Sequence, residues 1–177
     1  ALVALALTVP ATLSFAVTTT PAPSGPSAAA REACKMHTEG SAKWNKCIKR
    51  HSANFRDQDK YWAGVVMAKA GDYDGALEML NGIEAKSDAR VLTMIGYSIR
   101  KSGRIDEGIG YYHKALALDP NYVEAREYLG EGYLQQGALD KAKDQLVEIG
   151  KRCGLSCETY AELAKRIGEF EANAAKG

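Results

Sequence analysis

Apolar residues recur at spacings of three and four along most of the chain, which is the pattern of helices that bury one face. Between residues 57 and 154 these apolar stretches are separated by short breaks, and many of the breaks carry a glycine. The segment after Ser156 continues the pattern, with Tyr160, Leu163 and Ile167 on one side of a helix. The pattern predicts an all-α chain whose last helix has Ser156 as its N-cap.

The glycines reveal a repeat within these helical stretches. Glycines that close the first helix of each unit stand 32 and 34 residues apart, and a second set with the same spacing lies seven residues earlier. The closing glycines are Gly71, Gly103 and Gly137, and the earlier ones are Gly64, Gly96 and Gly130. We expect the earlier glycines to let the two helices of a hairpin approach closely. A period near 34 residues predicts stacked helical hairpins, each covering the apolar face of its neighbour.

Two of these units carry a motif. The second unit reads LTMIGYSIRKSGRIDEGIGYYHKALALDP, and the third reads REYLGEGYLQQGALDKAKDQLVEIG. They resemble the tetratricopeptide repeat, whose pattern is W-x2-L-G-x2-Y, then A-x3-F, then P; the second unit keeps the closing Pro120. The first unit departs most, with Lys60 at the aromatic position and Asp88 in place of the proline. The resemblance implies a right-handed solenoid of three helical hairpins in an exported bacterial member of this family.

The composition divides the chain further. Residues 1–16 carry no charge and end in a small-x-small pattern, which predicts a cleaved signal peptide; a retained membrane anchor is the alternative. The following residues are rich in Thr, Pro, Ser and Ala, which predicts an extended tether. The expected segments are signal peptide 1–16, flexible linker 17–30, basic helical hairpin 31–56, repeats 57–88, 89–122 and 123–155, and capping helix with tail 156–177.

Four cysteines, Cys34, Cys47, Cys153 and Cys157, are an even number in a chain expected to be exported, which predicts disulfides. Cys34 and Cys47 lie symmetrically about a Gly-Ser turn, and the other two flank the break before the last helix. Local pairing is therefore favoured among the three possible pairings. A thiol–disulfide redox function stays as an alternative, although no Cys-x-x-Cys motif is present.

Charge is uneven although its total is small. The net charge is +1, so the chain has no strong attraction for nucleic acid. Residues 31–56 contain seven Lys or Arg against two acids, whereas residues 57–150 contain eleven against sixteen. The basic hairpin is either the solvated face of a cap, with Trp44 packed on the first repeat, or a patch that meets an acidic protein or a lipid headgroup.

The sequence carries no catalytic motif. The histidines are far apart, and no phosphate-binding loop, dinucleotide fingerprint or nucleophile elbow is present. We therefore expect a protein that is not an enzyme and that has no cofactor and no metal site.

In the tetratricopeptide repeat family, the first helix of each hairpin lines a groove that binds polypeptides. The resemblance implies a groove that is apolar at one end, basic in the middle and acidic at the other. Its expected lining is Tyr61, Val65 and Ala68, then Arg90, Thr93, Tyr97 and Arg100, then Glu124, Glu127 and Glu131. The expected function is a protein-interaction scaffold of the bacterial envelope in the periplasm. The alternative is a membrane-tethered accessory subunit facing the periplasm.

Overall fold

The computed structural model describes residues 28–85 and 87–176, so the expected signal peptide and most of the expected linker lie outside the described residues. All regular structure in the described ranges is helical, which confirms the predicted all-α fold. The α-helices are α1 (Ala28–Ala33), α2 (Ala42–His51), α3 (Asp57–Lys69), α4 (Tyr73–Asn81), α5 (Ala89–Lys101), α6 (Ile105–Leu118), α7 (Val123–Gln135), α8 (Leu139–Cys153) and α9 (Glu158–Ala174), with a short 3-10 turn over Ser52–Asn54.

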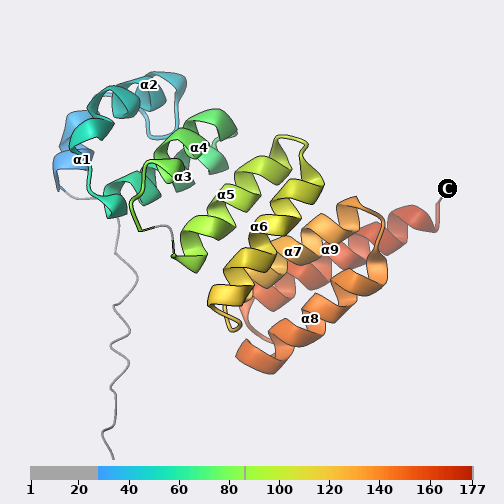
Figure 1. Cartoon of the computed structure of the whole chain (residues 1–177). Coiled ribbons are helices and arrows are strands. Elements are labelled where there is room, and N and C mark those ends of the chain that lie inside the picture. Colours follow the sequence, from blue (N-terminus) through green and yellow to red (C-terminus); the bar gives the residue numbers. More distant parts are fainter. Residues whose placement is uncertain (1–27, 86, 177) are drawn as a thin grey trace, which may run out of the picture.

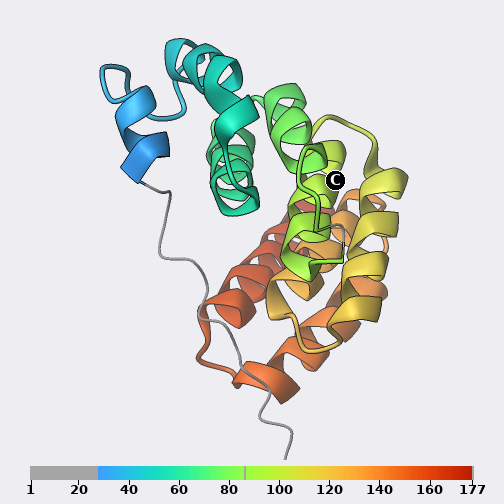
Figure 2. The same cartoon turned by 60° about the vertical axis from the view of Figure 1, so that its left-hand side comes forward.

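The helices pair as antiparallel hairpins, α3 with α4, α5 with α6 and α7 with α8, and each hairpin packs on the next. Figure 1 shows them in sequence order from α1 and α2 at one end to α8 and α9 at the other, and the turned view shows the same succession (Figure 2). The first helices α3, α5 and α7 contact one another, and α9 extends this row by packing against α7. The array is thus a helical-hairpin solenoid with one added helix at its end.

Glycines end the first helix of each hairpin, as predicted. Gly71, Gly103 and Gly137 have φ values of 87°, 98° and 74°, in the left-handed region that favours glycine. The amide of the residue after each glycine returns to a carbonyl in the last turn, for example Asp72 N to Met67 O at 2.9 Å. This is the hydrogen bond of a Schellman motif, and it turns the chain back at the same point in every hairpin.

The earlier glycines allow close approach of helices, but not always within one hairpin. A Cβ on Gly96 would lie 2.9 Å from the carbonyl oxygen of Gly108 in the partner helix α6. A Cβ on Gly130 would instead lie 2.7 Å from the side chain of Leu163 in α9. The prediction of contacts within a hairpin is therefore wrong for Gly130, because α9 lies where the first helix of a fourth hairpin would lie.

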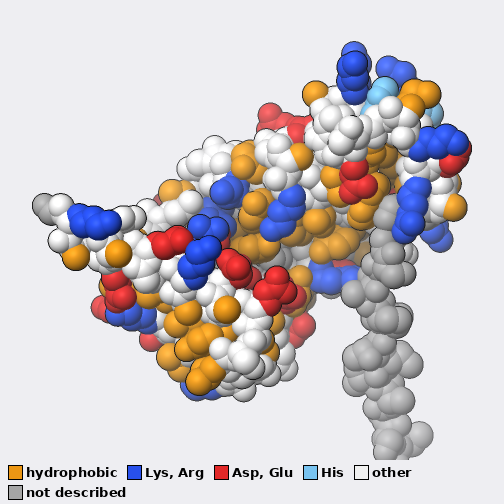
Figure 3. Space-filling view, turned by 180° about the vertical axis from the view of Figure 1, so that it is seen from behind, with side chains coloured by type: hydrophobic (Ala, Val, Ile, Leu, Met, Phe, Trp, Pro, Cys, Tyr) orange, Lys and Arg blue, Asp and Glu red, His pale blue; other side chains and the backbone are white. Residues whose placement is uncertain are grey.

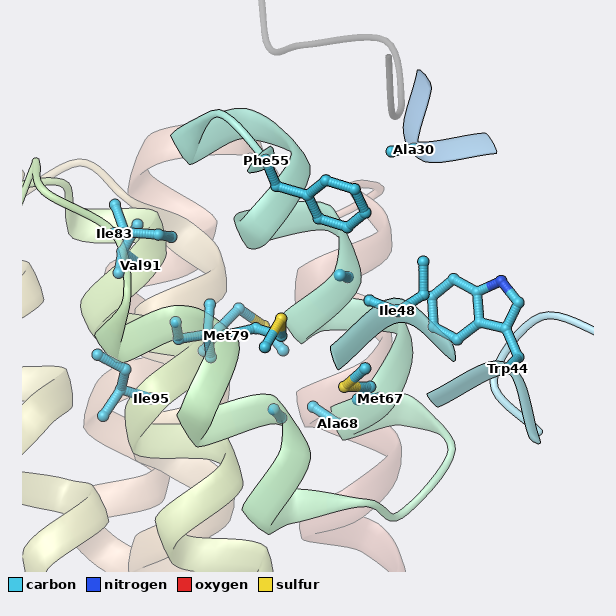
Figure 4. Packing of buried hydrophobic residues seen from close by; sticks show 14 of the residues in the cluster. Ala30, Trp44, Ile48, Phe55, Met67, Ala68, Met79, Ile83, Val91 and Ile95 are labelled. Atoms are coloured by element: carbon cyan, nitrogen blue, oxygen red, sulfur yellow. The ribbon is translucent and has the colours of Figure 1, made fainter. Parts of the chain in front are cut away.

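The N-terminal helices cover the first hairpin. Trp44 and Ile48 of α2 are buried, and the rings of Trp44 and Trp62 meet edge to face with centroids 5.3 Å apart. Figure 4 shows Trp44 and Ile48 next to each other, with Met67 of the first hairpin close by. The expected packing of Trp44 on the first repeat is confirmed.

Both disulfides have the predicted local pairing, Cys34 with Cys47 and Cys153 with Cys157. Cys34 is fully buried, and its disulfide joins the chain after α1 to α2. Cys153 is exposed at the end of α8, so the second disulfide closes only the short loop before α9.

Three boundaries differ from the prediction. Helix α1 begins at Ala28, and Ala30 is buried, so the expected linker of residues 17–30 extends too far. Helix α1 also ends at Ala33, so Cys34 follows the helix and does not lie within it. The N-cap of α9 is Cys157 and not Ser156, and no side chain caps the first turn of this helix.

Candidate functional site

The first helices of the hairpins, together with α9, surround a hollow of about 410 Å³. Its lining comes from α3, α5, α7 and α9, which lie in a row because each contacts the next. The residues are Lys69, Tyr97, Lys101, Glu124, Glu127, Tyr128, Glu131, Glu158, Thr159, Glu162 and Arg166. In the view from behind, hydrophobic side chains gather in the middle of the molecule, with charged side chains of both signs toward the C-terminal end (Figure 3). We call the hollow, together with the surface of the row of first helices that leads to it, the groove.

Two tyrosines from neighbouring hairpins form an aromatic wall. The rings of Tyr97 in α5 and Tyr128 in α7 have centroids 5.1 Å apart. The ammonium group of Lys69 lies 4.7 Å from the Tyr97 ring centre and 5.2 Å from that of Tyr128. Lys69 Nζ also donates a hydrogen bond of 2.8 Å to the Tyr128 hydroxyl. Contacts from three hairpins therefore hold these rings in place.

Beneath the wall lies a buried arginine network. Arg100 is only 2% exposed, and its guanidinium donates hydrogen bonds to Tyr112 Oη at 3.0 Å, Gln135 Oε1 at 3.0 Å and Glu131 Oε2 at 2.6 Å. The buried guanidinium of Arg100 therefore has hydrogen-bond acceptors and a carboxylate partner, as a buried cation requires. The prediction that Arg100 makes the middle of the groove basic is wrong, because Arg100 is buried and its charge is paired with Glu131.

The C-terminal half of the groove carries an excess of acid. Within the described residues, Glu124 and Glu127 of α7 and Glu158 and Glu162 of α9 form no ion pair and no side-chain hydrogen bond. Burial and then the charge of Glu131 raise the pKa of Glu127 to about 7, although nearby Lys69 lowers it.

One salt bridge ties the capping helix to this half of the groove. Arg166 of α9 lies 3.5 Å from Glu131 of α7, on the carboxylate that also accepts from Arg100. The same guanidinium lies 3.5 Å from Glu169 in its own helix. Glu131 is thus shared between the buried network and α9, which fixes α9 against the groove.

Outside the lining of the hollow, the α3 end of the row of first helices is aromatic and apolar. Tyr61 and Val65 of α3 are half-buried, and the Arg90 guanidinium lies 5.6 Å from the centre of the Tyr61 ring. Arg90 is paired with Asp88 at 2.6 Å. Burial raises the pKa of Tyr61 to about 12, so this phenol stays neutral.

Besides Arg100, two more of the expected lining residues do not reach the surface. Ala68 and Thr93 are each 1% exposed, and the Thr93 hydroxyl donates to the Ala89 carbonyl at 2.7 Å. Their prediction as lining is wrong because one step along a helix turns a side chain by about 100°. The structure brings to the surface Tyr61, Val65, Arg90, Tyr97, Glu124, Glu127 and Glu131.

Sequence reasoning omitted several residues that line the groove. Lys69 and Tyr128 stand on first helices, so the same helical spacing could have indicated them. Glu158, Glu162 and Arg166 stand on α9, which the sequence suggested only as a cap. No motif marks these positions.

The described residues contain no group of three or more His, Cys, Asp or Glu side chains able to hold a metal ion. None of the helices in residues 28–85 and 87–176 is both long and apolar enough to cross a bilayer. The absence of enzymatic activity and of a cofactor stays a prediction.

Parts of this chain are similar in sequence to a known repeat family and to curated proteins. Residues 100–152 match a family model described as a tetratricopeptide repeat. A peroxisomal targeting signal receptor of Kluyveromyces lactis is 36% identical over 61 residues, which are 34% of this chain and 11% of the receptor. The chloroplastic tetratricopeptide repeat domain-containing protein PYG7 of Arabidopsis thaliana is 29% identical over 92 residues, 49% of this chain and 31% of PYG7. The matched segments thus span less than a third of either relative.

Solved structures with the same fold include two bacterial proteins. The Yersinia enterocolitica type III secretion chaperone SycD, in complex with a peptide of the translocator YopD, has a TM-score of 0.54 at 20% identity, covering 67% of this chain and 92% of SycD. MamA of Desulfovibrio magneticus has a TM-score of 0.53 at 22% identity, covering 61% of this chain and 62% of MamA. These similarities show the fold of the repeat array.

Proposed function

Since residues 100–152 match a tetratricopeptide repeat model, we propose that this chain is a non-enzymatic interaction scaffold that binds a segment of another polypeptide in the groove. The observation that carries the proposal is the row of half-buried tyrosines, Tyr61, Tyr97 and Tyr128, presented by three successive hairpins. Tyrosine offers a large contact area with little loss of side-chain entropy, and it is enriched in protein interfaces.

The neighbour of similar fold supports a peptide as the ligand. SycD was solved in complex with a peptide of YopD. The lining of the hollow comes from four helices in a row, α3, α5, α7 and α9, so it suits an extended or helical segment better than a compact small molecule.

Selection from a phage-displayed library of random peptides tests the proposal. The intact protein should enrich peptides, and the variant Tyr97→Ala/Tyr128→Ala should lose them. Tyr111→Ala is the matched control, because Tyr111 is a half-buried tyrosine of α6 that packs against the same core outside the groove. Equal enrichment by all three proteins would show that peptides bind elsewhere and would overturn the proposal.

We also propose that the scaffold works in the bacterial cell envelope, in the periplasm. The two disulfides support this location, because disulfides persist in oxidising compartments. Mass spectrometry of the protein purified from its native cells should find a mature N-terminus at Val17. A protein that keeps the apolar segment before Val17 would contradict release into the periplasm.

A second candidate function, a membrane-tethered accessory subunit, rests on α2. Lys43, Lys46 and Arg50 share one face of this helix, opposite the buried Trp44 and Ile48. Within the described residues none of these three cations forms an ion pair, so the face is a stripe of free positive charge.

Co-sedimentation with phosphatidylglycerol vesicles tests this candidate. The intact protein should sediment with anionic vesicles at low salt and not at high salt, because headgroup attraction is screened. Lys43→Gln/Lys46→Gln/Arg50→Gln should abolish binding, whereas Lys141→Gln/Lys151→Gln/Lys165→Gln, which removes as many charges from α8 and α9, should not. Equal loss in both variants would point to net charge and would remove the candidate.

A further inference from the structure

We infer that the groove selects a basic polypeptide segment, whose Lys or Arg side chains lie over α7 and α9 and whose apolar side chains lie over α3. This inference rests on the proposed function, because it names the chemistry of the partner for the same groove. It follows from the distribution of charge, the aromatic wall and the division of the groove into two unlike halves.

The first observation is an uncompensated charge. The hollow is lined by five carboxylates, three on α7 and two on α9, and by three basic side chains. Of the bases, Arg166 is paired with Glu131, whereas Lys69 donates to the neutral Tyr128 hydroxyl, keeps its charge and lowers the pKa of Glu127. Four carboxylates therefore face the hollow with no ion-pair partner among the described residues. A cationic side chain entering between α7 and α9 would meet carboxylates on both sides.

The second observation is the aromatic wall beside these carboxylates. The chain's own Lys69 shows that the faces of Tyr97 and Tyr128 accept an ammonium group at 4.7 and 5.2 Å. Lys69 is exposed, so its side chain can move along the wall when a partner arrives. An incoming lysine or arginine would therefore find both a ring face and a carboxylate within reach.

The third observation is the carboxylate of Glu127. It is half-buried and unpaired within the described part of the chain, so its negative charge is poorly solvated. A partner cation placed next to it would stabilise the ionised form, and the gain would appear only in the complex. An acidic or phosphorylated segment would instead meet like charge in this half of the groove, which disfavours it.

The two ends of the groove set a direction for the segment. On α3, Lys69 lines the hollow, and beyond the hollow Tyr61 and Val65 are half-buried, with the nearby Arg90 already paired with Asp88. An apolar or aromatic side chain fits this end, whereas the cations fit the end at α7 and α9. Charge alone does not decide in which direction, N to C or C to N, the segment lies. Only the order of its apolar and cationic side chains across the groove is specified.

The experiment starts from the peptides recovered by display. Lys and Arg should be enriched in them relative to the unselected library. Fluorescence anisotropy should then show that replacing those cations by Gln weakens binding by about tenfold to a hundredfold, the range for hydrogen bonds to charged groups. The variant Glu124→Gln/Glu127→Gln should lose a similar factor toward the cationic peptide and should no longer distinguish it from its Gln version.

The matched control is Asp140→Asn/Asp144→Asn, which removes the same charge from α8 outside the groove. Circular dichroism of each variant checks that it is folded before its affinity is compared. If peptides bind without enrichment of Lys and Arg, or if the groove variant and the control behave alike, the inference is wrong while the scaffold proposal stands. If the intact protein selects no peptide, the scaffold proposal itself fails.

Discussion

At the N-terminal end of the array, α2 covers the first hairpin with Trp44 and Ile48, and a buried disulfide ties α2 to the chain after α1. At the C-terminal end, α9 covers the last hairpin with Leu163 and Ile167. The disulfide there joins the last residue of α8 to Cys157, the N-cap of α9, and so spans only the short loop between the two helices.

The two ends also differ in what they contribute to the groove. None of the residues that line the hollow comes from α1 or α2, whereas Glu158, Glu162 and Arg166 come from α9. The N-terminal cap therefore only closes the array, whereas the C-terminal cap closes it and also supplies one wall of the proposed binding surface. Damage to α9 should affect stability and binding together, and damage to α2 should affect stability alone.

The largest expected effect is that of Leu163→Ala. Leu163 is fully buried and fills the space that Gly130 leaves open, so its truncation creates a cavity between α7 and α9. We expect a loss of about 3 kcal/mol in the free energy of unfolding. Because α9 would then be loosened, peptide affinity should fall as well, and urea denaturation with fluorescence anisotropy measures both.

Ile48→Ala at the opposite end is the control for that comparison. Ile48 is also fully buried, and its truncation should cost about as much stability. Peptide affinity should be unchanged in this variant under conditions where the protein is folded. If both variants lose affinity equally, binding depends on overall stability, and α9 has no special part in the groove.

The N-terminal disulfide should give the next largest effect. Cys34 and Cys47 are 13 residues apart, and closing a loop of that length stabilises a protein by about 3 kcal/mol in the chain-entropy description. Cys34→Ala/Cys47→Ala should therefore lower the urea midpoint without a change in peptide affinity. A midpoint equal to that of the intact protein would show that packing of α2 alone closes this end.

The C-terminal disulfide should matter less and should be reduced first. Its cysteines are only 4 residues apart, which corresponds to about 2 kcal/mol in the same description. Cys153 is exposed while Cys34 is fully buried, so a reductant reaches the C-terminal bond more easily. Stepwise reduction followed by alkylation and peptide mass spectrometry should label Cys153 and Cys157 before the other pair; the reverse order would contradict this.

The same contrast shows what the sequence could and could not predict. The hairpins were predictable because a chain that turns through the left-handed region needs glycine, and Gly71, Gly103 and Gly137 recur at the required points. Local disulfides were predictable for a similar reason, since both depend on residues close in sequence. Features that depend on contacts between helices far apart in sequence could not be predicted from local spacing.

Arg100 and α9 are the clearest examples of that limit. Helical spacing places Arg100 on the groove side of α5, but its partners Tyr112 and Glu131 come from two other helices and draw it below the surface. The periodic motif ends before α9, so nothing in it indicates that Glu162 would face the groove. The lining of a groove is a tertiary property, and a repeat motif specifies only the part that each hairpin supplies for itself.

The smallest expected effect concerns the electrostatic influence of α9 on Glu127. Burial raises the pKa of Glu127 most, Glu131 and Glu124 of α7 and Glu162 of α9 raise it further, and Lys69 lowers it; the result is about 7, against 4.5 for an ordinary glutamate. The folded protein thus holds this proton more tightly than the unfolded chain. The resulting stability is fully present below pH 4.5 and is lost as pH rises through about 7.

Thermal unfolding of the intact protein and of Glu127→Gln at pH 5 and pH 8 measures this term. Relative to the intact protein, the variant should gain roughly 2 °C in melting temperature between pH 5 and pH 8, less than about 1 kcal/mol. This is well below what the full pKa difference would give, because solvent screens the partly exposed Glu127. Affinity for a cationic peptide should rise with pH through about 7 in the intact protein and not in Glu127→Gln, because only an ionised Glu127 attracts the cation. Glu162→Gln should move that transition to lower pH, since it removes the charge that α9 directs at Glu127. An unchanged transition would show that burial and the carboxylates of α7 set the proton affinity and that α9 acts on the groove only through packing.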